Sequence, residues 1–191
     1  MNLNLYKQKI INSILYFSKQ VKHPSKLKIF KLLYFLDFKH FKETGRSVTN
    51  YKYYAWEHGP VPKELFDELK DEISEEFKNF FTLRKTQISD EIEKIEFIPK
   101  QKPDFEIFTP RELRIMDELI LIFRDTSPKQ MSEISHLHNT PWDRTKKEKG
   151  MNEEIDYLLS IDSDSPLTVE EAEFYLKDRE EFLNNYPTPS L

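Results

Sequence analysis

The sequence predicts a mainly α-helical fold, a compact helical domain with a small β-hairpin or short strands, spanning residues 1–191 as one domain. Apolar residues recur at spacings of three and four along several segments, which is typical of helices packed against one core. The chain contains 15 Phe and 9 Tyr, and aromatic rings in this number can fill such a core. No internal repeat, low-complexity run or linker interrupts the pattern, so it indicates a single unit.

Two helices are expected at the start of the chain. The first covers residues 5–21 and the second covers residues 25–44. The apolar face of the first helix consists of Ile10, Ile14, Phe17 and Val21. The second helix is apolar nearly all round, which is typical of a central, buried helix, and Gly45 follows as its C-terminal cap.

The next segments are expected to be partly extended. Residues 46–56 are rich in Val, Thr, Tyr and Trp and favour extended structure, and residues 58–62 form a turn whose prolines set up a helix. That helix is expected to continue to Phe80, because apolar residues keep helical spacing at Val61, Leu65, Leu69, Ile73, Phe77 and Phe80. Residues 82–108 mix apolar and charged residues with two prolines, which predicts one or two short strands or a β-hairpin.

Three capping boxes predict helices in the second half of the chain. They begin at Thr109, Ser127 and Thr168, and each has Glu or Gln three residues later. The Thr-Pro-Trp sequence at 140–142 is expected to end the second of these helices, and the third is expected to end near residue 183. The tail from 184 to 191 is expected to be loose.

The composition excludes several classes of function. With no cysteine, the chain cannot form disulfides, zinc knuckles or iron–sulfur clusters, or use a catalytic thiol. With 3 Gly, it has no glycine-rich phosphate-binding loop. No secretion leader or stretch of about 18 apolar residues is present, so a cytoplasmic protein with no membrane partner is expected.

Charge is distributed unevenly along the chain, although the net charge is only −5. Residues 1–50 contain ten Lys and Arg against two acidic residues, whereas residues 151–191 contain eleven Asp and Glu against two basic ones. Two interpretations remain open: the two ends lie together and compensate, or a basic face meets an acidic partner or nucleic acid.

Histidine is the natural candidate for catalysis or metal binding. A site assembled from His58, His136 and Asp37 is conceivable, and a hydrolase using His58 and His136 is one alternative function. However, His136 and His138 point to different sides of a helix, and Ser135 does not face His136 as its neighbour on a helix. We therefore expect no catalytic residue, no metal site and no cofactor, and interpret the histidines as polar groups at turns.

Nucleic-acid binding is a second alternative. Arg46 and Lys52 are interleaved with aromatic residues between positions 51 and 56, a composition that can grip a phosphate backbone and stack on bases. A strand that alternates into a core has the same composition, and the pI of about 5.6 argues against a dedicated nucleic-acid binder.

The most distinctive local feature is Ala-Trp-Glu-His-Gly-Pro-Val at residues 55–61. A small residue, an aromatic residue, a glycine and a proline in succession indicate a tightly packed corner. The same segment could equally present an aromatic surface to a protein partner.

In order and spacing, these motifs resemble the Panacea domain, also called the SocA-like antitoxin family. The resemblance rests on Lys-Leu-Leu-Tyr-Phe at 31–35, the 55–61 segment, Ser-His at 135–136 and Pro-Trp at 141–142. It covers about residues 10–150 and leaves an acidic, helical C-terminal extension at 151–191. The shared fold or partner-binding positions that it implies are Tyr34, Trp56, His58, Gly59, Pro60, His136 and Trp142.

The resemblance implies a bacterial or phage-associated antitoxin that neutralises a cognate protein toxin by direct binding. The SocA-like branch further implies delivery of the bound toxin to a protease. The alternative is a nucleic-acid-binding regulator of a prophage or toxin–antitoxin operon. The excess of acidic residues at 151–191 suggests that the C-terminal helix mimics the nucleic-acid target of a basic toxin.

Overall fold

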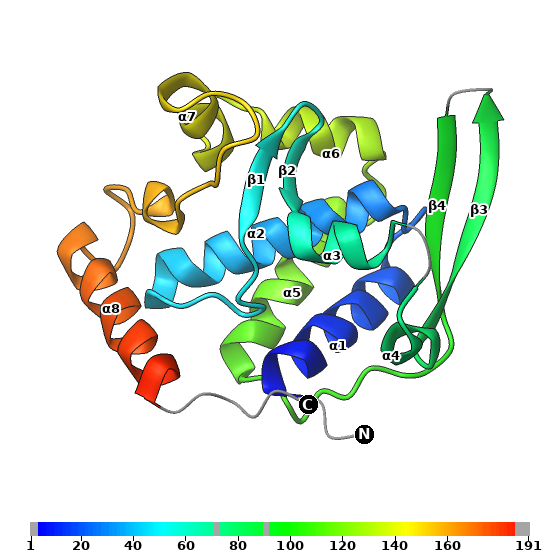
Figure 1. Ribbon diagram of the computed structural model, residues 1–191, viewed down its shortest axis with the longest axis horizontal. Coiled ribbons are helices and arrows are strands. Elements are labelled where there is room, and N and C mark those ends of the chain that lie inside the picture. Colours follow the sequence, from blue (N-terminus) through cyan, green and yellow to red (C-terminus); the bar gives the residue numbers. More distant parts are fainter. Residues whose placement is uncertain (1–3, 71–72, 90–91, 186–191) are drawn as a thin grey trace.

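The structure is a computed structural model that describes residues 4–70, 73–89 and 92–185. Its elements follow the chain in the order shown in Figure 1. They are α1 (Leu5–Gln20), α2 (Lys26–Thr44), β1 (Tyr53–Trp56), β2 (Gly59–Pro62), α3 (Lys63–Glu68), α4 (Glu75–Lys78), β3 (Phe81–Ser89), β4 (Ile92–Pro99), α5 (Pro110–Phe123), α6 (Pro128–Ser135), α7 (Pro141–Glu148), a 3₁₀ turn η1 (Tyr157–Ser160) and α8 (Val169–Asn185). The predicted mainly α-helical class with minor β structure is confirmed.

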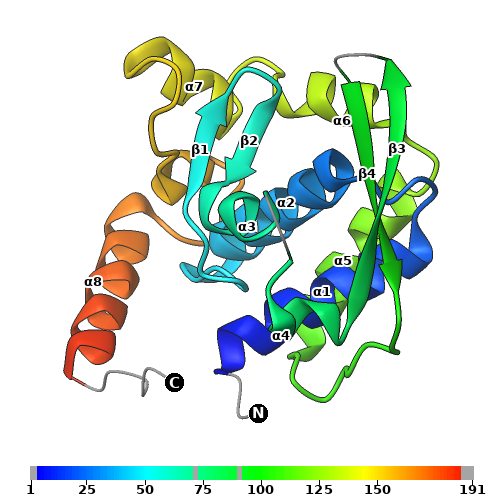
Figure 2. The same ribbon diagram turned by 45° about the vertical axis from the view of Figure 1, so that its right-hand side comes forward.

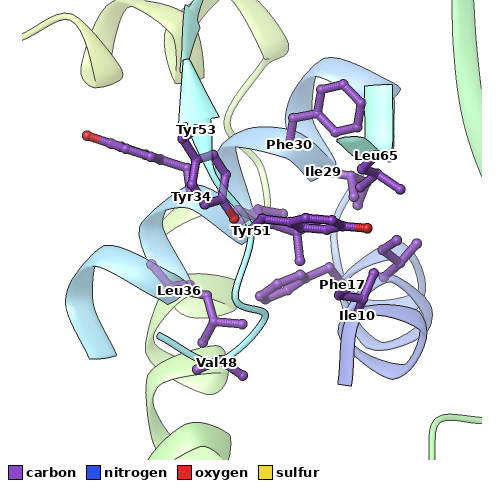
Figure 3. Close-up of a cluster of buried hydrophobic side chains, with 14 of the residues drawn as sticks. Ile10, Phe17, Ile29, Phe30, Tyr34, Leu36, Val48, Tyr51, Tyr53 and Leu65 are labelled. Atoms are coloured by element: carbon purple, nitrogen blue, oxygen red, sulfur yellow. The ribbon is translucent and has the colours of Figure 1, made fainter. Parts of the chain in front are cut away.

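Helix α2 is the centre of the fold. It contacts α1, α5, α6, β2 and η1, and nearly all of its apolar residues are buried, as its sequence predicted. Figure 3 shows side chains from α1, α2, α3 and residues 48–53 meeting in one cluster. A smaller cluster of Phe41, Ile161 and Ala172 packs α8 against the far end of α2.

Side-chain caps fix where the helices begin. The predicted capping boxes at Thr109 and Ser127 are both formed, with Glu112 and Gln130 returning a bond to the capping residue. Thr168 caps α8 in the same reciprocal way with Glu171. Gly45 ends α2 in the left-handed conformation, at φ 69°. A good cap contributes about 1 kcal/mol, which is enough to set a boundary.

The β structure consists of two separate antiparallel hairpins. The β1–β2 hairpin pairs Tyr53 with Pro62 and Trp56 with Gly59, and its outer β1 edge bonds to residues 152–155. The β3–β4 hairpin confirms the extended structure expected within residues 82–108. It stands beside the helices, and β4 is the strand nearer the body (Figures 1 and 2).

The helix expected from Val61 to Phe80 is wrong. Val61 lies in β2 between two prolines, and the residues after it form two short helices, α3 and α4. Leu65, Leu69 and Phe77 are buried as their spacing predicted, but they do not lie on one continuous helix. The turn expected at 58–62 is also shorter than predicted, since Gly59–Pro62 pairs as a strand.

The end of α6 also differs from the prediction. Thr140 does not end a helix but caps the N-terminus of α7, with Pro141 in its first turn. Pro at the first helical position is favoured because its missing N–H has no partner there anyway. The tail expected to be loose is helical at 184–185, and residues 186–191 lie outside the described residues.

Charge compensation between the two ends of the chain is visible in the structure. Lys42 pairs with Asp162 at 2.6 Å, and Arg46 lies 4.0 Å from Asp178 of α8. The basic first quarter of the sequence therefore lies partly against the acidic last quarter. No helix in the described part of the chain is long and apolar enough to cross a membrane.

Candidate functional site

The predicted site residues, although far apart in sequence, converge around the β1–β2 hairpin. Helix α2 places Lys31 and Tyr34 beneath the hairpin, the end of α6 brings His136, and the first turn of α7 brings Trp142. The hairpin itself carries Trp56, His58, Gly59 and Pro60. Every one of these positions therefore belongs to one contiguous region.

Three side chains hold the hairpin by its carbonyl groups. Trp142 Nε1 donates to the Trp56 carbonyl at 3.0 Å, and Ser132 Oγ donates to the His58 carbonyl at 2.8 Å. Lys31 Nζ donates to the Pro60 carbonyl at 2.8 Å. We call residues 53–62 with these three bonds the clamped hairpin. The donors come from α7, α6 and α2, so the hairpin is fixed from three directions.

Gly59 allows this close approach. Its φ of 100° is one that residues with a side chain rarely adopt. A Cβ atom built there would lie 2.5 Å from Ser135 Oγ and 2.8 Å from Lys31 Cε and Nζ. Glycine is therefore required by both the backbone conformation and the packing.

Lys31 is a buried cation beneath the hairpin. Its side chain is fully buried, and the Pro60 carbonyl is its hydrogen-bond acceptor in the described structure. No carboxylate of the described residues lies within salt-bridge distance of it. Burial lowers the pKa of Lys31 to about 7, so a substantial fraction of this amine is neutral near physiological pH.

Tyr34 and Asp37 support the hairpin from the next turn of α2. The Tyr34 ring is buried against Phe38 and Tyr53, and burial raises the pKa of its hydroxyl. This hydroxyl faces the Trp142 backbone amide but makes no hydrogen bond of regular geometry with it. Asp37 accepts bonds from the Tyr53 hydroxyl at 2.7 Å and from the Thr49 amide and hydroxyl. Burial raises the pKa of Asp37, and these donors oppose the rise. Asp37 thereby shapes the chain that enters β1.

His136 stacks on Trp142. Their ring centroids are 3.8 Å apart, and the planes differ by 20°. Burial lowers the pKa of His136, and the charges of Lys31, Lys146 and His58 lower it further. Its Nε2 is buried without a hydrogen-bond partner, so the ring serves here as an apolar support for the indole that clamps the hairpin.

The exposed side of the clamped hairpin forms one wall of a groove. The groove has a volume of about 770 Å³ and a mostly apolar lining. Trp56 meets Phe66 edge to face at 4.8 Å, and Lys26 Nζ lies 4.0 Å above the Phe66 ring. His58 lies on the same wall, and Ile95 of β4 lies on the other. We call this space the hairpin groove.

A family model described as "Antitoxin SocA-like, Panacea domain" matches residues 29–143, more than half of the chain. The chain belongs to this family. The match begins in α2 and ends in α7, so the Panacea segment contains the clamped hairpin and all three of its donors. It is shorter at both ends than the expected 10–150, and α1 and α8 lie outside it. No curated protein and no solved structure matches the chain.

The Panacea domain does not assemble the hypothetical histidine site. In the described ranges, no group of three His, Cys, Asp or Glu side chains is placed to hold a metal ion. Asp37 is committed to Thr49 and Tyr53 rather than to either histidine. Ser135 Oγ is buried and donates to the Ser132 carbonyl, so it lacks the bond to a general base that an activated nucleophile needs.

The basic and aromatic residues of the nucleic-acid hypothesis are dispersed. Tyr51 and Tyr53 are buried in the core, and Lys52 pairs with Glu154 at 3.0 Å. Arg46 lies beside Asp178. These residues thus form no continuous basic surface with stacking faces, and their alternation is that of a chain entering a core, which was the other interpretation.

Two features of this site escape sequence reasoning. Ser132 and Phe66 belong to no motif, and only the folded chain brings them to the hairpin. The role of Lys31 had a detectable signal, because it lies between Leu27 and Tyr34 on a helix that is apolar nearly all round. A lysine in such a position must find a polar group inside the protein.

Proposed function

We propose that this Panacea protein is an antitoxin that neutralises a cognate protein toxin by direct binding, and that the hairpin groove is the contact surface. The observation that carries the proposal is the arrangement of the family motif. Its buried members hold a hairpin rigid, and its partly exposed members, Trp56 and His58, line an apolar groove. Rigid aromatic side chains in a concave surface are the usual energetic centre of protein interfaces.

The chemistry of the groove suits binding better than catalysis. Its lining is mostly apolar and includes Phe30, Trp56, Val61 and Phe66. A rigid wall reduces the conformational entropy lost on association, because the hairpin is already ordered before the partner arrives. Membership of an antitoxin family supports a toxin as the class of partner.

The test is co-expression with the product of the adjacent gene, scored by growth and by co-purification. Wild type is expected to restore growth and to form a complex of fixed stoichiometry. Trp56→Ala removes the aromatic wall but keeps the carbonyl that Trp142 binds, so the clamp survives. It is expected to weaken binding by about 2 kcal/mol, or roughly 30-fold.

Phe105→Ala is the matched control, because Phe105 is a partly exposed aromatic residue that packs on Tyr16 away from the groove. It is expected to neutralise like wild type. Equal losses in the two variants would show that the groove is not the contact surface. A harmless neighbour, or no complex with wild type, would refute the antitoxin function itself.

Delivery to a protease is a further proposed step and has its own readout. If the antitoxin hands the toxin to a protease, the half-life of the toxin falls when the antitoxin is present. Neutralisation with an unchanged toxin half-life would mean that binding alone suffices.

A second proposed contact is helix α8, which lies outside the matched family segment. Glu170 and Glu173 are exposed on it beside Phe174, which is 66% exposed. An aromatic side chain surrounded by carboxylates complements a basic protein surface. This helix would add specificity for a nucleic-acid-targeting toxin to the shared groove.

A further inference from the structure

One wall of the hairpin groove is the edge of a strand. Strand β4 lies between β3 and the body of the molecule in both views (Figures 1 and 2). In the β3–β4 ladder, Lys100 N–H bonds to the Phe80 carbonyl, so even-numbered residues of β4 direct their backbone groups toward β3. Odd-numbered residues direct theirs toward the body.

That inner edge of β4 is only partly covered. Phe97 N–H donates to the Pro24 carbonyl at 3.0 Å, and the contact with the start of α2 ends at the Ser25–Glu96 bridge. The bridge also engages the Ile95 carbonyl, but the N–H groups of Glu93 and Ile95 follow in the same phase and have no acceptor on this edge in the described structure. Both residues line the groove.

The opposite wall cannot satisfy this edge. Strand β2 contains Pro60 and Pro62, which have no N–H to donate, and the Pro60 carbonyl is already bonded to Lys31. The two hairpins therefore face each other across the groove without pairing. An unpaired strand edge beside an apolar groove is a template for an added strand.

The charge of Lys26 indicates which side chain an added strand would place in the groove. Lys26 lines the groove above Phe66, and no carboxylate of the described residues lies within salt-bridge distance of its ammonium. Burial and, to a smaller extent, the charge of Lys85 lower the pKa of Lys26 to about 8 while the charge of Asp67 opposes the shift, so Lys26 remains mostly charged at neutral pH. Glu57 and Glu93 also line the groove without pairing to Lys26, so a carboxylate on the added strand would give this ammonium a direct partner.

We propose that an extended segment of the toxin adds to the inner edge of β4 at Glu93 and Ile95, with apolar side chains in the hairpin groove and a carboxylate against Lys26. This inference rests on the proposed antitoxin function and specifies how the toxin is held. Main-chain bonds to β4 give affinity for any extended segment, and the aromatic wall and Lys26 select its side chains.

The test uses the full chain and the adjacent gene product that wild type binds. Ile95→Pro removes the inward N–H without breaking a β3–β4 bond, and it is expected to weaken binding at least tenfold. Lys85→Pro is the matched control, because Lys85 pairs with Ile95 in register but directs its N–H to the outer edge of β3. Lys85→Pro is expected to bind within about threefold of wild type. Ile95→Ala keeps the N–H but shortens a side chain of the groove wall, so it is expected to weaken binding less than Ile95→Pro does.

Two further measurements separate strand addition from a general loss of structure. Hydrogen exchange at the Ile95 amide is expected to slow on complex formation, and Lys26→Glu is expected to weaken binding at least tenfold. If Ile95→Pro binds as well as Lys85→Pro, or if the Ile95 amide exchanges equally fast in the complex, strand addition is wrong while the antitoxin function stands. If wild type forms no complex, both proposals fall.

Discussion

Lys31 makes the stability of this protein depend on pH in a way that a single substitution can isolate. Its pKa is about 7 in the folded protein and 10.5 in the unfolded chain. The unfolded chain therefore binds more protons between these values, and the free energy of unfolding rises with pH there. For one such group, the rise from pH 7 to pH 9 is about 2 kcal/mol, or about 4–8 °C in Tm for a chain of this size.

The assay is urea unfolding of wild type and Lys31→Met at both pH values. The variant loses the bond to the Pro60 carbonyl, but that loss is the same at pH 7 and pH 9 and cancels in the comparison. Lys26 and Lys28, whose pKa values are also lowered by burial, are present in both proteins. His136, whose pKa is lowered by burial, is also present in both proteins.

When the pH rises from 7 to 9, the free energy of unfolding is thus expected to increase by about 2 kcal/mol more in wild type than in Lys31→Met. If the two proteins change by the same amount, Lys31 keeps its ordinary pKa and water or an anion reaches it. The reasoning about a buried, unpaired ammonium beneath the hairpin would then be wrong.

Three other changes test the site. Gly59→Ala is expected to lower the free energy of unfolding by about 2–4 kcal/mol, from backbone strain and the clash with Ser135. Gly150→Ala is the control for strain alone, because Gly150 has φ 105° and nothing within 4 Å of an added Cβ atom. Equal losses of stability in the two variants would refute the packing argument. Trp142→Phe leaves the Trp56 carbonyl without its donor and is expected to lower the free energy of unfolding by about 1–3 kcal/mol, so unchanged urea unfolding would contradict the clamp. Reversing the exposed charges Glu170 and Glu173 to lysine is expected to slow toxin association roughly tenfold at low salt, and a rate equal to wild type would exclude α8 as a contact.

Local chemistry made much of the fold predictable. Capping boxes at Thr109, Ser127 and Thr168 and the glycine after α2 set helix boundaries through bonds within four residues, which a sequence displays directly. The buried character of α2 was equally visible, since a helix that is apolar nearly all round is typical of the centre of a fold.

The two wrong helix predictions, at residues 61–80 and at Thr140, have the same cause: a local pattern fits more than one chain path. The spacing from Val61 to Phe80 is satisfied by a strand and two short helices, because periodicity records which residues are buried and not whether the chain between them is continuous. At Thr140, Thr-Pro suits both the end of one helix and the start of another, and only the downstream packing of Trp142 on the hairpin decides between them.

The site was predictable only as a set of positions. The motif residues are visible in the sequence, but their spacing does not show that Trp142 and Lys31 bind carbonyls of one hairpin, since those bonds join residues 86 and 29 positions apart. The groove was not predictable at all, because β4 and Phe66 reach it through tertiary packing alone.

The clamp has a consequence for how this scaffold changes over time. All three of its bonds end on main-chain oxygens, and every amino acid carries the same oxygen. Replacing the residue displayed at position 57 or 58 therefore alters the outer face of the hairpin and leaves its frame as it was. Because the bonds that hold the hairpin do not depend on these side chains, single substitutions at the two positions can change what the surface recognises without lowering the stability of the hairpin.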